Sequence, residues 1–261
     1  MVERSLDIHR TALVTGATAG IGRAIAEAFG ALGWRVAIGA RREDRLDDAV
    51  AAVALAGGRG FGHGLDVTDP DSVDAFVSAA EKALGPIDVL VNNAASSEPG
   101  PLHELRPEQI RETLESGLLG SLLMSRRVLA SMLPARRGGD ILFISSRAAV
   151  LPWPRQVPYA AAKAGIEAAA AALRAELAGT GIRSLIVRVG DTVATEFASG
   201  WSPEQLAEVG YWAKLGLLAG GWLQPTQVAA AVVAAVTAPR GVQLETVVVN
   251  PEPPLAKPES Q

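Results

Sequence analysis

Seven short runs of apolar and β-branched residues alternate along this chain with longer segments of helical periodicity. The runs are almost continuously apolar, as strands covered on both faces must be, and we read them as buried strands. They are Thr11–Thr15, Arg35–Ala40, Gly60–Leu65, Val89–Val91, Ile141–Ser145, Leu185–Val189 and Glu245–Val249. The segments with apolar residues at intervals of three and four are Ile21–Leu32, Glu43–Leu55, Asp71–Leu84, Pro107–Leu133 and Val157–Leu177.

This alternation restricts the fold. Repeated strand–helix units predict parallel strands joined by right-handed crossovers, with helices on both faces of one sheet. Asp69-Pro70 and Arg106-Pro107 are predicted helix starts, because proline is favoured at the first helical position. No linker divides the chain, so we expect an α/β fold with a single domain over residues 1–250. The segment at about 195–223 has no strand partner, and residues 251–261 form a proline-rich tail.

Composition excludes several classes of protein. The chain has 261 residues and a net charge of −4, and its basic residues are scattered, so we predict no nucleic-acid partner. It lacks cysteine, which excludes disulfides, a thiolate nucleophile and Cys-ligated metals. The three histidines (His9, His63 and His103) are isolated from one another, so we predict no catalytic metal. No signal peptide or uncharged apolar run of about 18 residues occurs, so we expect a cytoplasmic protein without a membrane span.

A glycine-rich turn follows the first strand. Its pattern is G-x-x-x-G-x-G, and it lies between a predicted strand and a predicted helix. Gly16 allows the tight turn, Gly20 lets the backbone approach a pyrophosphate, and Gly22 lets the helix and strand pack closely. The helix N-terminus then offers free N–H groups to the phosphates. We therefore predict a dinucleotide site that includes Thr18 and Ile21 as well; the alternative is a purely structural turn.

The end of the second strand indicates which dinucleotide binds. Folds that use NAD place an acidic residue there, about 20 residues after the glycines, on the ribose hydroxyls. Here that place holds Arg41 and Arg42, with no carboxylate before Glu43. Guanidinium groups bind a 2′-phosphate through charge-assisted hydrogen bonds, so we predict NADP(H). The alternative is that both arginines are solvated residues at a helix start.

A tyrosine and a lysine lie four residues apart at the start of a predicted helix. This spacing places Tyr159 and Lys163 on one helical face. A nearby cation favours phenolate and so lowers the pKa of a tyrosine, which suits it for proton transfer. Ser146, at the end of the preceding strand, supplies a hydroxyl that can hold a carbonyl oxygen. We predict that these three residues are catalytic.

Taken together, the motifs resemble those of the short-chain dehydrogenase/reductase family over nearly the whole chain, up to about Pro251. The residues that carry the resemblance are Thr15-Gly16-(x)3-Gly20-Ile21-Gly22, Asp66-Val67, Asn92-Asn93-Ala94-Ala95, Ser146, Tyr159-(x)3-Lys163 and Val189-Gly190 through Thr195. The resemblance implies a Rossmann fold with a doubly wound seven-stranded parallel sheet. It also implies hydride transfer between C4 of a nicotinamide and a carbonyl or alcohol carbon, and a homo-oligomer, either a tetramer or a dimer.

The resemblance also implies roles for individual residues. Tyr159 would give or take the proton, Ser146 would polarise the substrate oxygen, and Lys163 would lower the pKa of the tyrosine and hold the nicotinamide ribose. Further cofactor contacts are implied for Asp66 and Val67 at the adenine, Asn93 and Ala94 at the adenosine ribose and sheet edge, and Val193 and Thr195 at the carboxamide. The Arg41 position matches the NADP-preferring branch, whereas Ala19 stands where the family usually has a further basic residue.

One departure from the family pattern affects the predicted activity. Gly117 occupies the place of the asparagine that usually completes the catalytic set and helps a proton relay. Two functions therefore remain open. The first is an NADP(H)-dependent oxidoreductase, and the alternative is an NADP(H)-binding protein with weak or no turnover, serving as a sensor or partner subunit. A third possible function is that of a Rossmann methyltransferase, but the Ser–Tyr–Lys set argues against it.

The segment at about 195–223 falls where the family places its substrate lid. It holds three of the five tryptophans, among them Trp201 and Trp212. With Trp153 they predict apolar walls that suit a hydrophobic carbonyl or alcohol substrate. The alternative is that these aromatic residues pack the lid against the core or against a neighbouring subunit.

Overall fold

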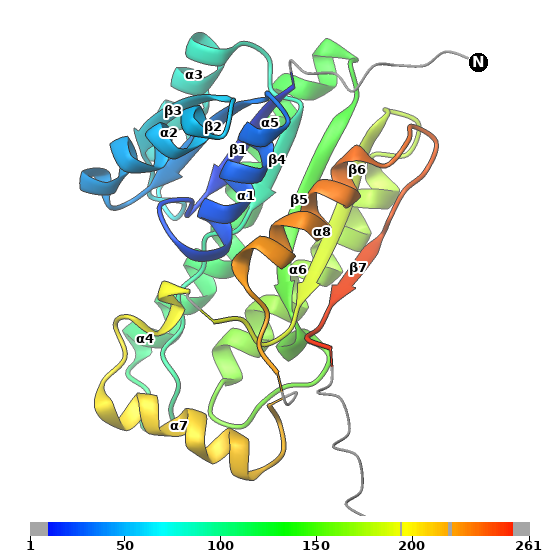
Figure 1. Cartoon of the computed structure of the whole chain (residues 1–261). Helices are drawn as coiled ribbons and strands as arrows, with labels where there is room; N and C mark the ends of the chain where they lie inside the picture. The colour runs from blue at the N-terminus through cyan, green and yellow to red at the C-terminus, as the bar shows by residue number, and fades with distance from the viewer. Residues whose placement is uncertain (1–9, 194, 219–220, 253–261) are drawn as a thin grey trace, which may run out of the picture.

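The strands form one parallel sheet of seven in the order β3-β2-β1-β4-β5-β6-β7, seen in a computed structural model that describes residues 10–193, 195–218 and 221–252 (Figure 1). The strands are β1 (Thr11–Thr15), β2 (Arg35–Ala40), β3 (Arg59–Gly64), β4 (Val89–Asn92), β5 (Gly139–Ser146), β6 (Ile182–Val189) and β7 (Thr246–Val249). Every neighbouring pair is parallel. The predicted α/β fold with its doubly wound sheet is confirmed.

Helices cover both faces of the sheet and bury two apolar cores (Figure 1). One layer holds α1 (Gly20–Ala31), α2 (Leu46–Leu55) and α8 (Pro225–Thr237), and the other holds α3 (Pro70–Leu84), α5 (Gly120–Ala135) and α6 (Val157–Glu176). Along β1, Ala12 and Val14 face the first core while Leu13 faces the second. Successive side chains of a strand point to opposite faces, which is why these strands are apolar at every position.

The strand order places a crevice at one edge of the sheet. The chain winds outward from β1 through β2 to β3, then returns to β4 on the other side of β1. In open α/β sheets, ligands bind at such a reversal, outside the carboxyl ends of the strands. Beyond these ends lie α4 (Pro107–Leu114) and α7 (Pro203–Lys214), at the lower end of the molecule in Figure 1.

The element boundaries differ from the predicted ones in a few places. Helices α3 and α4 begin at Pro70 and Pro107 as predicted, and the Asp69 carboxylate caps α3 by accepting a hydrogen bond from the Asp71 N–H. The helical segment predicted over Pro107–Leu133 is confirmed, since α4, the π-helical segment η2 (Glu115–Leu119) and α5 follow one another without a gap; the π-type turn within it was not predicted. Gly117 lies within η2, where its low helix propensity agrees with a break in the regular hydrogen bonding. Neither α7 nor α8 was predicted from the sequence.

Two features discussed in the sequence analysis fall outside the residues that the structure describes. His9 and all of the tail beyond Glu252 lie outside the described residues. In the described ranges, His63 contacts the Gly64 carbonyl oxygen at 2.7 Å and His103 lies 3.4 Å from the Glu104 carboxylate. Across the same ranges, no helix combines the length and the apolar character needed to cross a membrane.

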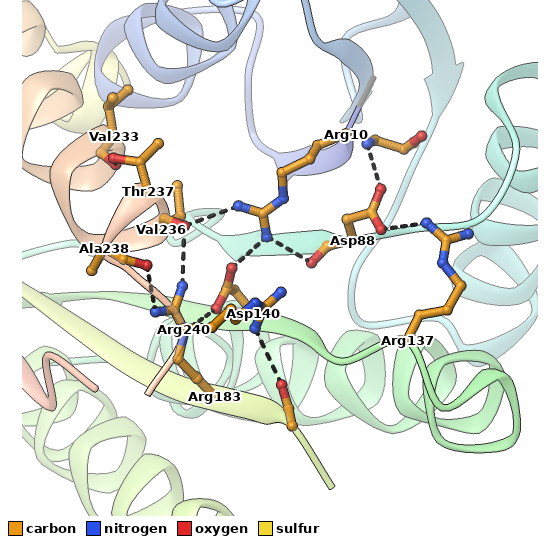
Figure 2. Close-up of polar contacts among 12 residues, drawn as sticks. Arg10, Asp88, Arg137, Asp140, Arg183, Val233, Val236, Thr237, Ala238 and Arg240 are labelled. Carbon is orange, nitrogen blue, oxygen red and sulfur yellow. Dashed lines mark hydrogen bonds and ion pairs between the residues drawn. The ribbon is translucent and has the colours of Figure 1, made fainter. Parts of the chain in front are cut away.

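A buried charge network closes the opposite, amino edge of the sheet (Figure 2). The Asp140 carboxylate, at the start of β5, is fully buried and pairs with both Arg10 and Arg183. Arg183 also donates to the carbonyl oxygens of Val236 and Ala238, at the end of α8, and Arg10 donates to that of Val236. The last carbonyls of a helix lack intrahelical donors, so these guanidinium groups tie the end of α8 to the sheet.

We expect Asp140→Ala to destabilise the fold severely, because it leaves two guanidinium groups partly buried without their carboxylate. Removing one partner of a buried ion pair costs about 3–5 kcal/mol. Asp74→Ala is the matched control, since Asp74 pairs with Arg127 but is 66% exposed. It should cost at most about 1 kcal/mol. The measurement is the free energy of unfolding in urea, and equal losses for the two variants would contradict the structural role of Asp140.

Candidate active site

A large cleft of about 950 Å³ opens at the carboxyl ends of the strands. All of the residues that were predicted from the sequence to form a site line this cleft. They are Gly16, Thr18, Gly20, Ile21, Gly22, Arg41, Arg42, Asp66, Val67, Asn93, Ala94, Ser146, Trp153, Tyr159, Lys163, Val193, Thr195, Trp201 and Trp212. Residues from most of the chain therefore converge at the topological switch point of the sheet.

The glycine-rich turn joins β1 to α1 in a backbone conformation that requires glycine. Gly16 and Gly20 have φ angles of 65° and 54°, which side chains rarely allow. A Cβ on Gly22 would lie 2.5 Å from both the side-chain nitrogen Nδ2 of Asn93 and the Gly16 carbonyl oxygen. Helix α1 starts here with no acidic residue in its first turn, so its free N–H groups and positive dipole end fit an anionic group. The turn therefore fits the pyrophosphate of a dinucleotide.

Residues after β4 hold this turn in place. The Asn93 side-chain amide donates to the carbonyl oxygens of Thr15 and Gly16, at 2.9 and 3.2 Å. The Thr15 hydroxyl accepts from the backbone N–H groups of Asn93 and Ala94, both at 3.0 Å. Asn93 and Ala94 thus position the glycine turn, a role that the sequence did not indicate.

Asp66 stands just beyond β3, at the side of the cleft. Its carboxylate accepts hydrogen bonds from the backbone N–H and the hydroxyl of Thr68, at 2.9 and 2.7 Å. These two bonds hold the pKa of Asp66 below its ordinary value. The residue therefore presents a fixed, ionised acceptor to the cleft.

The three predicted catalytic side chains meet in the middle of the cleft. Strand β5 ends at Ser146, and the first two turns of α6 carry Tyr159 and Lys163. Ser146 forms a hydrogen bond with the phenol of Tyr159 and accepts another from the Ala148 N–H at 3.1 Å. The Lys163 Nζ donates to the Ile144 carbonyl oxygen at 2.8 Å and lies 5.6 Å from the centre of the Tyr159 ring.

Burial controls the protonation of this set. It raises the pKa of Tyr159, and the hydrogen bond with Ser146 offsets the rise only in part. Burial also lowers the pKa of Lys163 to about 8. The expected lowering of the tyrosine pKa by the lysine is not found, because Lys163 donates to a backbone carbonyl and faces the ring. A phenol with a raised pKa keeps its proton at neutral pH and can donate it.

An unbroken series of aromatic rings runs from Tyr159 to the lid. Phe197, in the short helix η4 (Glu196–Ala198), lies 5.1 Å from the Tyr159 ring and 5.6 Å from that of Trp201. The series continues to Trp212 and then to Trp153, with centroid distances of 6.2 and 5.1 Å. Phe197 was missed in the sequence, where nothing but its place two residues after Thr195 sets it apart.

Two of these tryptophans are also fixed to the protein by their indole N–H groups. Trp201 donates to the Ser97 carbonyl oxygen at 2.6 Å and Trp212 to that of Pro154 at 2.9 Å. Trp212 is 2% exposed, so it packs α7 against the loop that holds Trp153. Both interpretations of the lid aromatics therefore describe part of it: they line the cleft, and they pack the lid against the rest of the protein.

Arg147 is a second residue that the sequence analysis missed. It directly follows Ser146, and its guanidinium group lies 5.4 Å from the centre of the Trp153 ring. It also pairs with Asp191 at 3.6 Å. Its position immediately after a strand-end serine was the available signal. The pair joins the end of β5 to the loop after β6 beneath the lid.

The position of the missing asparagine has space for a Cβ. A Cβ added to Gly117 would meet the Cβ of Ala162 at 3.4 Å, an ordinary contact. The neighbouring Ser116 hydroxyl donates to the Glu112 carbonyl oxygen at 2.7 Å and contacts the Ser96 hydroxyl at 2.9 Å. Steric crowding at the Cβ does not impose glycine here, and Ser116 is already engaged in its own contacts.

Comparison with known proteins adds to this geometry. Residues 10–206 match the family model described as short chain dehydrogenase. Relatives include a short chain dehydrogenase of Pseudocercospora fijiensis, 39% identical over 184 residues or 69% of this chain. Another is the granaticin polyketide synthase putative ketoacyl reductase 1 of Streptomyces violaceoruber, 41% identical over 175 residues or 66% of this chain. The chain spans 59% and 63% of the length of these two relatives.

A solved structure with a similar fold is that of an actinorhodin polyketide ketoreductase with NADPH. The two chains are 32% identical with a TM-score of 0.81, and the match covers 94% of this chain and 97% of the other. Both the sheet and the arrangement of its helices therefore have a counterpart in a protein crystallised with a nicotinamide dinucleotide.

We expect Lys163→Met to stabilise the folded protein at pH 7. Lys163 is 4% exposed, and its folded pKa of about 8 lies below the ordinary value of 10.5. Below pH 8 the lysine is charged in both states, so the folded state bears the whole burial cost, about 3 kcal/mol. Loss of the bond to Ile144 offsets part of the gain, which leaves about 1–3 kcal/mol.

The same linkage gives a pH signature. From pH 8 to 10.5 the folded protein loses the proton while the unfolded chain keeps it, so the burial cost fades and wild-type stability rises. The advantage of Lys163→Met should therefore shrink across this window. Unfolding in urea at a series of pH values measures it, with the exposed Lys82→Met as the control. A constant difference between Lys163→Met and wild type would show that this pKa is not lowered.

Proposed function

The chain belongs to the short-chain dehydrogenase/reductase family, an oxidoreductase family that uses a nicotinamide cofactor, and from this premise we propose that it is an NADP(H)-dependent carbonyl reductase or alcohol dehydrogenase for a hydrophobic small molecule. The observation that carries the proposal is the meeting of Ser146, Tyr159 and Lys163 in one cleft with the glycine turn. A proton donor thus lies beside a seat for a dinucleotide.

The chemistry divides between the cofactor and the protein. When bound, NADPH supplies a hydride to the carbonyl carbon of the substrate. Tyr159 donates its phenolic proton to the carbonyl oxygen, so that the C=O bond becomes an alcohol and the phenol is left as phenolate. The Ser146 hydroxyl holds the same oxygen by a hydrogen bond.

Lys163 supports the proton transfer from its position near the face of the Tyr159 ring. Its pKa of about 8 allows it to pass a proton onward at neutral pH. In this proposal Lys163 also holds the nicotinamide ribose, with Val193 and Thr195 at the carboxamide. Asp66, Val67, Asn93 and Ala94 lie at the adenosine end of the cleft.

The arginines at the end of β2 support NADP(H) over NAD(H). Arg41 and Arg42 line the cleft where an acidic residue would bind the ribose hydroxyls of NAD. Their side chains are 63% and 44% exposed, so they can reach a phosphate placed there. The similar actinorhodin ketoreductase was crystallised with NADPH, which agrees with this assignment.

The aromatic wall supports a hydrophobic substrate. Trp153, Trp201 and Phe197 line the half of the cleft next to Tyr159, where an apolar or ring-bearing substrate would place its carbonyl group. One relative is a putative ketoacyl reductase of a polyketide synthase, which makes a ketone the first substrate class to test. The rival proposal, a binding protein with little turnover, rests on Gly117, since glycine cannot take part in a side-chain proton relay.

Tyr159→Phe should lower the rate of ketone reduction by about 100-fold or more, the usual contribution of a general acid. The assay follows the loss of NADPH absorbance across a panel of aliphatic and aromatic ketones. Tyr211→Phe is the matched control, because the chain has only two tyrosines and Tyr211 stacks against Arg155 outside the catalytic set. Equal rates for wild type and Tyr159→Phe would refute the role of Tyr159. Tight NADPH binding without turnover on any ketone would favour the binding-protein alternative.

Arg41→Ala should weaken the binding of NADPH by about tenfold while leaving that of NADH almost unchanged. The change removes a charge-assisted contact to the 2′-phosphate, worth about 1.5 kcal/mol or more. Calorimetric titration of both cofactors measures the two affinities. Arg111→Ala serves as the control, because this exposed arginine pairs with Glu115 within η2. Equal losses for NADPH and NADH would overturn the cofactor assignment.

A further inference from the structure

All three arginines near the end of β2 are paired with carboxylates from across the cleft. Arg42 and Arg45 both bind Glu196, each through a different carboxylate oxygen, and the Arg45 contact is 2.5 Å. Arg41 lies 3.5 Å from Glu112, which belongs to α4. The partners thus come from segments far away in the sequence, and they meet at the place where the ribose 2′-position of a dinucleotide would lie.

Glu196 is the stronger of the two carboxylate partners. It opens the helix η4 (Glu196–Ala198) at the start of the lid, directly after Thr195 and before the Phe197 ring that packs on Tyr159. Arg42 and Arg45 hold the pKa of its carboxyl below the ordinary value, so it is an anion at neutral pH. Its side chain is 35% exposed, against 51% for Glu112. One carboxylate therefore pairs with two guanidinium groups at the mouth of the cleft.

We propose that Glu196 is a specificity-determining residue for the cofactor, and that its carboxylate competes with the 2′-phosphate of NADP(H) for Arg42 and Arg45. This inference rests on the proposed use of NADP(H). A phosphate and a carboxylate both accept hydrogen bonds from the planar N–H groups of a guanidinium. A guanidinium that binds one of them therefore has fewer well-oriented N–H groups for the other. NADH has two hydroxyls at this ribose and leaves the ion pairs undisturbed.

The competition makes the preference for NADP(H) weaker than three arginines would otherwise give. It also predicts the direction in which the affinity changes. Replacing Glu196 with a neutral residue frees two guanidinium groups for the 2′-phosphate and removes a carboxylate that repels it. Because these side chains are partly exposed, solvent screens the effect, which we expect to be about two- to fivefold in affinity. Glu112→Gln should act in the same direction through Arg41, and less strongly, since that pair is longer and more exposed.

The test uses two nucleotides that differ only at the 2′-position. Adenosine 2′,5′-bisphosphate and adenosine 5′-monophosphate are titrated by calorimetry into the wild-type protein and into Glu196→Gln. We expect the variant to bind the bisphosphate about two- to fivefold more tightly and the monophosphate with unchanged affinity. The gain should fall when the ionic strength is raised. Glu204→Gln is the control, since Glu204 is a lid carboxylate in the first turn of α7 that contacts Ser202.

The outcomes separate the two proposals. If Glu196→Gln weakens both nucleotides equally, Glu196 closes the lid over any dinucleotide and the competition is wrong. If it changes neither, the ion pairs do not matter for binding and the inference is again overturned. In both cases a wild-type preference for the bisphosphate leaves the NADP(H) assignment intact. A wild-type protein that binds both nucleotides equally contradicts the cofactor assignment itself.

Discussion

The close approach of the glycine turn to the end of β4 fixes the geometry of the whole cleft. Asn93 bonds two carbonyl oxygens of the turn, and no side chain at position 22 would leave room for that amide. This contact orients the N-terminus of α1 toward the cleft, and it holds β1 and β4 at the point where the strand order reverses. Ser146, one strand further along the sheet, is placed relative to the same edge. The glycine turn and the Ser146–Tyr159 pair are therefore held relative to the same strands, β1, β4 and β5.

The proposed catalytic set includes a residue whose burial costs stability. A lysine that is buried and held by one backbone carbonyl is costly, and its burial lowers its pKa to about 8. The same burial raises the pKa of Tyr159 and keeps it protonated. Desolvation thus acts on both groups in the direction of the neutral form: it raises the pKa of Tyr159 and lowers that of Lys163. The sequence pattern places the two side chains on one helical face but contains no information on how deeply they lie.

Motifs bound to local backbone geometry could be predicted, and features that depend on tertiary contacts could not. The strands, the glycine turn and the proline starts of α3 and α4 follow from periodicity and from residue conformation. Helix α8 was not predicted because its Val- and Ala-rich segment is apolar at nearly every position. The hydrophobic pattern of this segment therefore shows no clear helical period. The break at η2 and the pairing of Glu196 with Arg42 depend on segments distant in the sequence. Local propensity does not report these contacts.

The ion pairs at the amino ends of the strands differ in character from those at the carboxyl ends. At the amino edge, Asp140 is fully buried between two arginines, and its pairs cannot open without exposing a charge to an apolar interior. At the carboxyl edge, the ion pairs of Arg41, Arg42 and Arg45 are half-exposed, and water replaces their partners at little cost. A ligand that brings its own anion can compete at the second edge and not at the first. If the proposed use of NADP(H) holds, single charges at the carboxyl ends of the strands adjust its affinity without loosening the fold that holds the site.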